Sequence, residues 1–279
     1  MARGRGRRSA GAAAPEPAAA GPAPGDYPID TGVATLERDP YSDTGWILQV
    51  NGVPSSHVDL ADPGRLDFEY MRWMAALLRA RFPADARLRA LHLGGGACSM
   101  ARWVHSAYPE ARQVVVELDG RLAGLVREWF DLPRAPLLRL RVGEAGEVLG
   151  SLTESTRDVI IRDVFAGDRT PAGLTGEATA TDADRVLAPG GIYVVNSGNA
   201  PDLAEFRREA AVLGAVFEHV AAIADPAMFK GRRRGNVVIA ASQSPILPEV
   251  ALPELGRELL GGGVPATYWD DARVRGFAR

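Results

Sequence analysis

A run of three glycines between an apolar stretch and a helical stretch is the part of the sequence best suited to bind a ligand. Gly94, Gly95 and Gly96 follow residues 88–93, which read as a strand. Glycine lets the backbone approach a ligand where a Cβ atom would collide. The helix expected over residues 99–107 would point its N-terminal N–H groups and the positive end of its dipole at the same place. The turn is therefore typical of a nucleoside cradle.

Acidic residues at the ends of the next expected strands fit the same kind of ligand. Glu117 ends a strand about 20 residues after the turn, the spacing at which an acid receives the ribose hydroxyls of a nucleotide. A carboxylate suits a vicinal diol because each of its oxygens accepts one O–H. Asp119 is the competing candidate for this role. Glu144, after the third strand, is placed to accept a hydrogen bond from an exocyclic adenine amine.

A further acid at the end of the fourth expected strand could make the site catalytic. Asp163 comes after the strand expected near residues 158–161, whose apolar part is 159–161 (VII), and would lie at the carboxyl edge of the sheet. An acid there can attract a cationic amine, orient it, and accept its proton as it attacks an electrophilic carbon. The structural alternatives are a helix cap or an ion pair with Arg162 or Arg169.

The elements that must position these residues alternate between strand and helix patterns, as a doubly wound sheet requires. The pattern predicts a class I S-adenosylmethionine-methyltransferase-like (Rossmann-like) α/β sheet of seven strands, the last of them antiparallel. Strands are expected near residues 88–93, 113–117, 137–142, 158–161, 191–195, 215–222 and 236–241, and helices near 70–82, 99–107, 121–130, 176–187 and 203–213.

Before this sheet, short strands near residues 33–37, 46–50 and 56–58 predict a small antiparallel cap, with Asn51-Gly52 as a hairpin turn. The expected organisation is a disordered tail rich in Arg, Ala and Pro over 1–26, the β cap over 27–64, the nucleoside-binding catalytic domain over 65–245, and a C-terminal helix and tail over 246–279.

Composition excludes several classes of protein. A formal net charge of −3 argues against a dedicated nucleic-acid binder. One cysteine rules out an intramolecular disulfide and a cysteine-cluster metal site, and the four histidines lie too far apart for a zinc motif. No segment approaches the roughly 18 apolar residues of a membrane span. We expect a cytoplasmic protein without a metal, in which Cys98 is a packed small residue and His92 a buried, hydrogen-bonded one.

From about Thr31 to Ser242 the sequence resembles the spermidine synthase (polyamine aminopropyltransferase) family. The discriminating part is the cap, because the glycine turn and the acids alone would describe any class I methyltransferase. The matching segments are 36–39 (LERD), 48–52 (LQVNG), 93–96 (LGGG), 115–119 (VVELD), 143–145 (GEA), 158–163 (DVIIRD) and 187–191 (LAPGG).

The resemblance implies a function and roles for individual residues. It implies transfer of an aminopropyl group from decarboxylated S-adenosylmethionine to an amine, with release of methylthioadenosine, in an enzyme that forms a homodimer. Asp163 would be the catalytic base that orients the attacking amine. The residues implied to bind the donor are Gly94, Gly95, Gly96, Glu117, Asp119, Glu144 and Ala145.

The departures from the family fall on the amine side. Where the family has Gly-Gly-Gly-Asp-Gly, this chain has Ala97 and Cys98 after its glycines. The family's Asp-x-x-Asp pair becomes Asp163 with Ala166, and the next acid is Asp168. Each lost carboxylate removes a charge-assisted contact to a diammonium substrate, worth roughly 1.5–3 kcal/mol. Two alternatives therefore stay open: a methyltransferase that uses S-adenosylmethionine on an unknown small molecule, and a non-catalytic nucleoside-binding relative.

Overall fold

The computed structural model describes residues 22–167 and 169–279. Most of the expected tail, and Asp168, lie outside these residues. The last two residues of the expected tail differ from the prediction, because Gly25 and Asp26 already belong to a strand. Among the described residues, no helix is long and apolar enough to cross a membrane.

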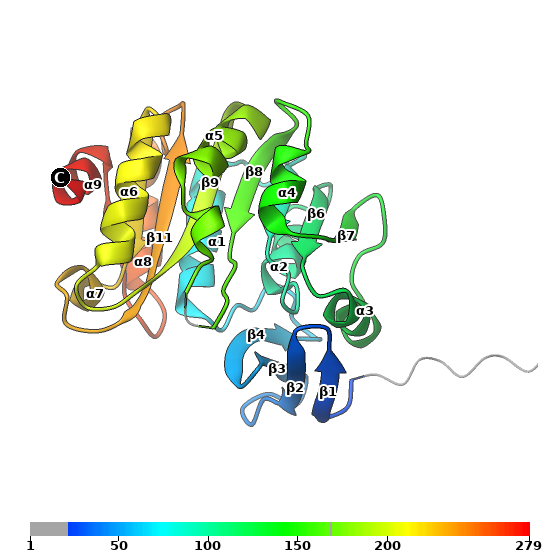
Figure 1. Ribbon diagram of the computed structural model, residues 1–279. Coiled ribbons are helices and arrows are strands. Elements are labelled where there is room, and N and C mark those ends of the chain that lie inside the picture. The colour runs from blue at the N-terminus through cyan, green and yellow to red at the C-terminus, as the bar shows by residue number, and fades with distance from the viewer. Residues whose placement is uncertain (1–21, 168) are drawn as a thin grey trace, which may run out of the picture.

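The N-terminal cap is a sheet of four antiparallel strands in sequence order. Its strands are β1 (Gly25–Ile29), β2 (Gly32–Arg38), β3 (Gly45–Val50) and β4 (Val53–Asp59). Asn51 and Gly52 both have positive φ angles, 52° and 76°, which is the geometry of a tight hairpin turn. The sequence predicted three of these strands and missed β1. Figure 1 shows the cap below the main sheet, at the edge to which the arrow of β8 points.

The main sheet has the predicted doubly wound topology with one more strand. Its order is β12-β10-β11-β9-β8-β5-β6-β7. The neighbouring strands β7, β6, β5, β8 and β9 run parallel to one another, and β11 is antiparallel to both of its neighbours. The bounds are β5 (Arg89–Leu93), β6 (Arg112–Glu117), β7 (Leu138–Val142), β8 (Arg157–Arg162), β9 (Leu187–Asn199), β10 (His219–Ala224), β11 (Gly235–Ser242) and β12 (Thr267–Trp269).

Helices cover both faces of this sheet. In Figure 1, α4, α5 and α6 lie in front of the sheet, and α1 and α2 lie behind it. The helices are α1 (Glu69–Arg81), α2 (Ser99–Ala107), α3 (Gly120–Trp129), α4 (Ala145–Gly150), α5 (Glu177–Val186), α6 (Ala204–Val216), α7 (Pro226–Phe229), α8 (Leu252–Leu260) and α9 (Asp271–Ala278), with 3-10 turns at Ala172–Leu174 and Glu249–Ala251. The sequence missed α4, and it placed a strand from residue 215, where α6 is still helical.

The C-terminal segment is more ordered than expected. Instead of an irregular tail after one helix, the chain adds β12 to the edge of the sheet beside β10 and then forms α9. The aromatic ring of Trp269 stacks on Phe229, with centroids 3.8 Å apart. Burial of this tryptophan fastens the C-terminal segment to the sheet.

Candidate active site

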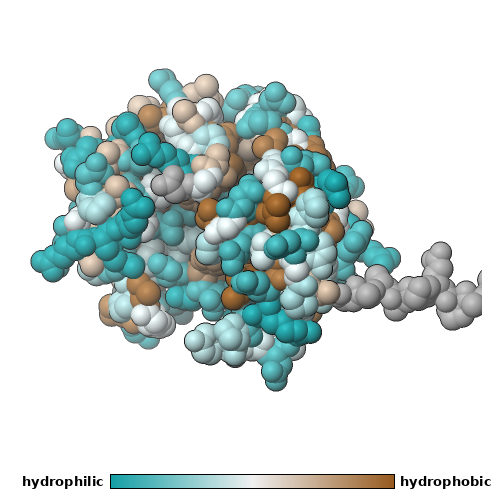
Figure 2. Space-filling view, turned by 60° about the horizontal axis from the view of Figure 1, so that its bottom comes forward, coloured by the Kyte–Doolittle hydropathy of each residue, from teal (hydrophilic) through white to brown (hydrophobic). Residues whose placement is uncertain are grey.

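A cavity of about 1070 Å³ opens at the carboxyl ends of the parallel strands. Open α/β sheets bind their ligands at this edge, where the strand order reverses. Its lining includes the glycine turn after β5, the ends of β6, β8 and β9, and residues 53–56 of the cap. Figure 2 looks onto this side of the molecule and shows hydrophobic residues gathered in the middle, bordered by hydrophilic ones.

The glycine turn has a geometry that other residues could not adopt. Gly94 and Gly96 have φ angles of 92° and 47°. A Cβ atom on Gly94 would lie 2.2 Å from the carbonyl oxygen of Asp163, and one on Gly96 would lie 2.6 Å from Ser56 Oγ. Both distances are too short for non-bonded atoms, so the close approach of three chain segments depends on these glycines.

Glu117 reaches across from the end of β6 and holds the turn. Its Oε2 accepts hydrogen bonds from the backbone N–H groups of Gly95 (3.0 Å) and Gly96 (3.1 Å), and its Oε1 accepts one from Asp119 (3.1 Å). A carboxylate offers about four acceptor positions. Three are used within the protein, so Glu117 has about one left for a ligand, on Oε1.

Asp119 does not line the cavity, which corrects its candidacy as a ligand for ribose. Its side chain is 2% exposed. One carboxylate oxygen caps α3 by accepting from the N–H of Leu122, and the other accepts from the N–H and the hydroxyl of Thr31 in the cap. Burial acts to raise the pKa of Asp119, but these hydrogen bonds lower it overall. The carboxylate therefore joins the cap to the main domain.

Glu144 and Ala145, which the sequence suggests as donor-binding residues, both line the cavity. Glu144 is the N-cap of α4, and its Oε2 accepts a hydrogen bond of 2.8 Å from the N–H of Glu147. A side chain that caps a helix in this way is fixed in orientation. Its other oxygen has no hydrogen bond to the described residues and is available to a donor such as an exocyclic amine.

Asp163 is held by two side chains that sequence reasoning did not find. Tyr70 on α1 donates its hydroxyl to Oδ2 (2.8 Å), and Asn196 on β9 donates its side-chain amide to Oδ1 (2.9 Å). All three residues line the cavity. Burial raises the pKa of Asp163 above its ordinary value, although both hydrogen bonds act to lower it. The site thus contains a positioned carboxylate that is a stronger base than one in water.

The ion pair expected as an alternative for Asp163 is made by its neighbour instead. Side chains alternate between the two faces of a strand, so Arg162 points to the face opposite Asp163. There Arg162 pairs with Glu209 on α6 at 2.6 Å, and both side chains are almost fully buried. Asp163 is consequently left to its two neutral hydrogen-bond donors.

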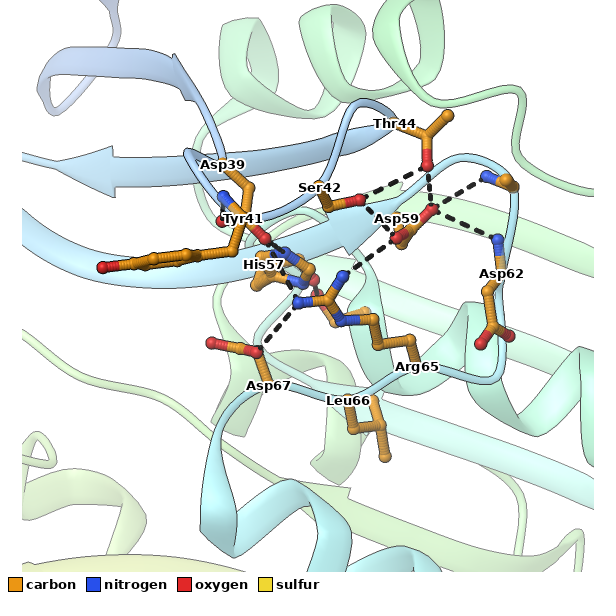
Figure 3. A network of polar contacts seen from close by, with 12 residues as sticks. Asp39, Tyr41, Ser42, Thr44, His57, Asp59, Asp62, Arg65, Leu66 and Asp67 are labelled. Atoms are coloured by element: carbon orange, nitrogen blue, oxygen red, sulfur yellow. Dashed lines mark hydrogen bonds and ion pairs between the residues drawn. The ribbon is translucent and has the colours of Figure 1, made fainter. Parts of the chain in front are cut away.

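The cap supplies part of the site and is anchored by a buried polar cluster. Figure 3 shows this cluster, in which Arg65 lies between Asp39 and Asp59, 3.2 Å from a carboxylate oxygen of each. His57 Nε2 lies 2.9 Å from Asp39. Burial acts to raise the pKa of Asp59, but hydrogen bonds from Thr44 and other donors lower it overall. Charged groups are tolerated here because each one has partners.

The same segment of the cap contacts the glycine turn directly. Ser56 Oγ accepts a hydrogen bond from the N–H of Ala97 (3.0 Å), and Ser99 donates its hydroxyl to the carbonyl oxygen of His57 (2.7 Å). Position 97 holds an acid in the family that the sequence resembles. Here it is a fully buried alanine whose N–H binds the cap.

Two other residues near the turn have the structural roles expected for them. Cys98 is buried, and burial raises the pKa of its thiol to about 12, which disfavours the thiolate needed for a nucleophile. His92 is also buried and lies 2.9 Å from Gln113. Burial lowers the pKa of His92 to about 4, so the ring is neutral at physiological pH. In the described residues no group of three or more His, Cys, Asp or Glu side chains could hold a metal.

No protein-family model matches the chain. Over 141 residues it is 31% identical to the polyamine aminopropyltransferase of Chromobacterium violaceum, covering 50% of this chain and 53% of that protein. The match therefore spans about half the length of the curated relatives. A crystal structure of a spermidine synthase in complex with the transition-state analogue AdoDATO aligns with a TM-score of 0.61 over 91% of this chain and 82% of that one, at 16% identity, which shows a shared fold.

A further solved structure is similar over nearly the whole length. The crystal structure of a probable spermidine synthase from Corynebacterium glutamicum aligns with a TM-score of 0.87 and 49% sequence identity. The alignment covers 92% of this chain and 94% of that chain, so it includes the cap as well as the main sheet. The chain belongs to the spermidine synthase family.

Proposed function

We propose that this protein is a transferase that moves an aminopropyl group from decarboxylated S-adenosylmethionine to an amine. The observation that carries the proposal is the position of Asp163, a half-buried carboxylate at the carboxyl edge of the sheet with Tyr70 and Asn196 as its only hydrogen-bond partners among the described residues. Membership of the spermidine synthase family supports the reaction class.

The size and the lining of the cavity are consistent with a nucleoside donor bound at one end and an acceptor bound at the other. Its volume of about 1070 Å³ slightly exceeds the range of about 300–1,000 Å³ for small-molecule sites, which supports room for two ligands. The glycine turn provides a surface without Cβ atoms for the donor. Glu117 would accept from a ribose hydroxyl, and Glu144 and Ala145 would border the adenine.

The proposed step needs one base and a fixed geometry. When bound, the donor supplies an electrophilic carbon next to a sulfonium, which is already a good leaving group. Asp163 accepts a proton from the ammonium form of the acceptor, which frees the nitrogen lone pair. The nitrogen then forms the new C–N bond as the C–S bond breaks, and the electron pair of that bond stays on sulfur. Positioning supplies most of the remaining acceleration.

The raised pKa of Asp163 assists this step. A carboxylate is ordinarily a weak base towards an alkylammonium, and burial narrows the gap between the two pKa values. Tyr70 acts as a neutral donor, because burial and the nearby Asp163 raise its own pKa well above the ordinary value. It therefore orients the carboxylate without competing for the proton.

The test is to incubate the protein with decarboxylated S-adenosylmethionine and a panel of amines and to measure methylthioadenosine by chromatography. We expect product with at least one amine. Asp163→Asn should abolish turnover while leaving donor binding, measured by calorimetry, unchanged. A parallel reaction with S-adenosylmethionine tests the methyltransferase alternative, and binding without turnover in every arm would favour the non-catalytic alternative.

Two further expectations belong to the same proposal. The family resemblance implies a homodimer, which light scattering of the purified protein would test. A cytoplasmic location would be tested by cell fractionation.

A further inference from the structure

We call the part of the cavity beyond Asp163 the acceptor end. Its charges differ from those of a site built for a diamine. Beyond Asp163 its wall is formed by Phe68, Val164, Phe165 and Ala166. A linear diamine carries a second ammonium that needs a carboxylate of its own when it leaves water. The acids near this end therefore decide which acceptor fits.

Those acids are already engaged by other groups of the protein. Glu69, next to Tyr70, lies 3.8 Å from Arg233 and is not part of the cavity wall. Asp202 lines the cavity but accepts a hydrogen bond from the N–H of Ala204 (3.2 Å). Glu205 also lines the cavity and pairs with Arg208. Glu69 and Glu205 would have to share their arginine partners with a second ammonium, whereas Asp202 keeps acceptor positions beside its bond to Ala204.

A guanidinium group at the same end has no such partner. Arg234 lines the cavity, and it makes no hydrogen bond or ion pair through its side chain with residues 22–167 or 169–279. Its neighbour Arg233, in contrast, pairs with Asp225 at 2.7 Å. Arg169 adds a second positive charge to the lining. A cationic far end of the acceptor would be repelled here, and an anionic one would be attracted.

The sheet register gives how far along the sheet the backbone of this arginine lies from the level of the residue that holds the base. Asn196, which holds Asp163, pairs with Val238 on β11, and Gly235 pairs with Asn199 at the end of β9. Arg234 precedes Gly235, so its Cα lies four residues from Val238, about 13 Å along the strand. Figure 1 shows the loop between α7 and β11 at the same edge of the sheet as the cap. An elongated acceptor could therefore reach both groups.

We propose that the acceptor is an amino carboxylate: an amine that places its nitrogen at Asp163 and its carboxylate at Arg234. The inference rests on the proposed function for the reaction, and it names the chemical class of the second substrate. Arginine suits the far end because its planar guanidinium can donate two parallel hydrogen bonds to a carboxylate. The apolar side chains that line the same cavity fit the methylene chain of such a molecule.

The experiment compares acceptors of equal length that differ only in the far end. The probes are 4-aminobutanoate, 6-aminohexanoate and 8-aminooctanoate, each beside the α,ω-diamine and the n-alkylamine of the same chain length. Turnover is measured as methylthioadenosine formed from decarboxylated S-adenosylmethionine. We expect kcat/KM for the best amino carboxylate to exceed that of its matched diamine and monoamine roughly ten- to 150-fold, the range of one charge-assisted hydrogen bond.

Variants of the loop identify the group responsible. Arg234→Gln should erase the preference for the amino carboxylate, and Arg234→Glu should reverse it in favour of the diamine. Arg232→Gln is the matched control, because this exposed arginine of the same loop does not line the cavity. Equal or better use of the diamine by the unmodified protein, or an unchanged preference in Arg234→Gln, would overturn the proposal.

Calorimetry separates this inference from the proposed function. Each probe is titrated into protein saturated with methylthioadenosine, which needs no turnover. One outcome is that amino carboxylates bind selectively, bind at least tenfold more weakly to Arg234→Gln, and give no turnover in any arm. That outcome would support the proposed class of ligand and refute the transfer reaction. Turnover with diamines alone would keep the reaction and refute the ligand class.

Discussion

Replacement of Glu117 by glutamine tests the geometry of the donor end. In the native protein three backbone N–H groups occupy three of about four acceptor positions of this carboxylate. The structure thus predicts one strong hydrogen bond to the ribose, where the sequence suggested two. Glutamine keeps one acceptor oxygen for the glycine turn, but its NH₂ group then faces the N–H of Asp119, and the acceptor for ribose is lost.

The magnitude follows from the loss of a single charge-assisted bond. Such a bond contributes about 1.5–3 kcal/mol, so the affinity for methylthioadenosine should fall roughly ten- to 150-fold. The assay is isothermal titration calorimetry with methylthioadenosine and its 2′-deoxy and 3′-deoxy analogues. In the native protein one of the two deoxy analogues should bind as weakly as methylthioadenosine binds to Glu117→Gln. With the variant, removing that hydroxyl should cost little more.

A matched control distinguishes ligand binding from folding. Asp119→Asn can keep the cap of α3 through its amide oxygen, but it turns an NH₂ group towards the N–H of Thr31 without touching the cavity, so it should lower the melting temperature and leave the affinity unchanged. Native affinity in Glu117→Gln would refute the reasoning. Equal losses for both deoxy analogues in the native protein would refute the count of acceptor positions.

Three other substitutions test separate parts of the structure. Gly94→Ala should lower the free energy of unfolding by at least about 1–3 kcal/mol, because φ at this position is positive and the new Cβ would meet the carbonyl oxygen of Asp163. Gly124→Ala, in the open middle of α3, should not lower it. Thermal denaturation compares the two variants. Tyr70→Phe removes a hydrogen bond that lowers the pKa of Asp163, so the acidic limb of the pH profile of kcat/KM should move to higher pH. Asp59→Asn should cost about 1.5–3 kcal/mol at neutral pH. Because folding lowers the pKa of Asp59, this contribution is present above the unfolded value and is lost as pH falls below about 4, so urea denaturation at neutral and acidic pH should show the difference shrinking.

The sequence predicted elements whose signals are local and missed those that depend on distant contacts. The strands β5, β6, β7 and β8 were found because their apolar runs end in glycine or acidic residues, and β9 because Gly190-Gly191 comes just before its apolar run. The strand β1 contains Pro28 and does not alternate clearly between polar and apolar residues, so it becomes a strand only by pairing with β2. Helix α4 has six residues, two of them glycine, which is too short for a periodic pattern. The edge strand β12 forms only beside β10.

The candidate site shows the same division between local and distant information. Asp163 was identified because it ends an apolar strand, but its partner Tyr70 lies 93 residues away and Asn196 lies 33 away. No spacing rule connects residues at such separations. Asp119 has the residue type and position of a ribose ligand, and only the contact with Thr31, 88 residues away, reveals its role in joining the cap. The charge at Arg234 likewise acquires meaning only from the register of β9 and β11.

The contact between β4 and the glycine turn has a consequence for redesigning the protein. Deleting the cap would remove the hydrogen bonds that hold the N–H of Ala97 and the hydroxyl of Ser99, so the donor end would lose part of its support even though its acids lie elsewhere. Arg234 and the apolar wall make no hydrogen bond to the cap among the described residues. An evolving or engineered descendant can therefore exchange its acceptor by changing the loops after β8 and before β11, while the cap and the turn are inherited as one unit.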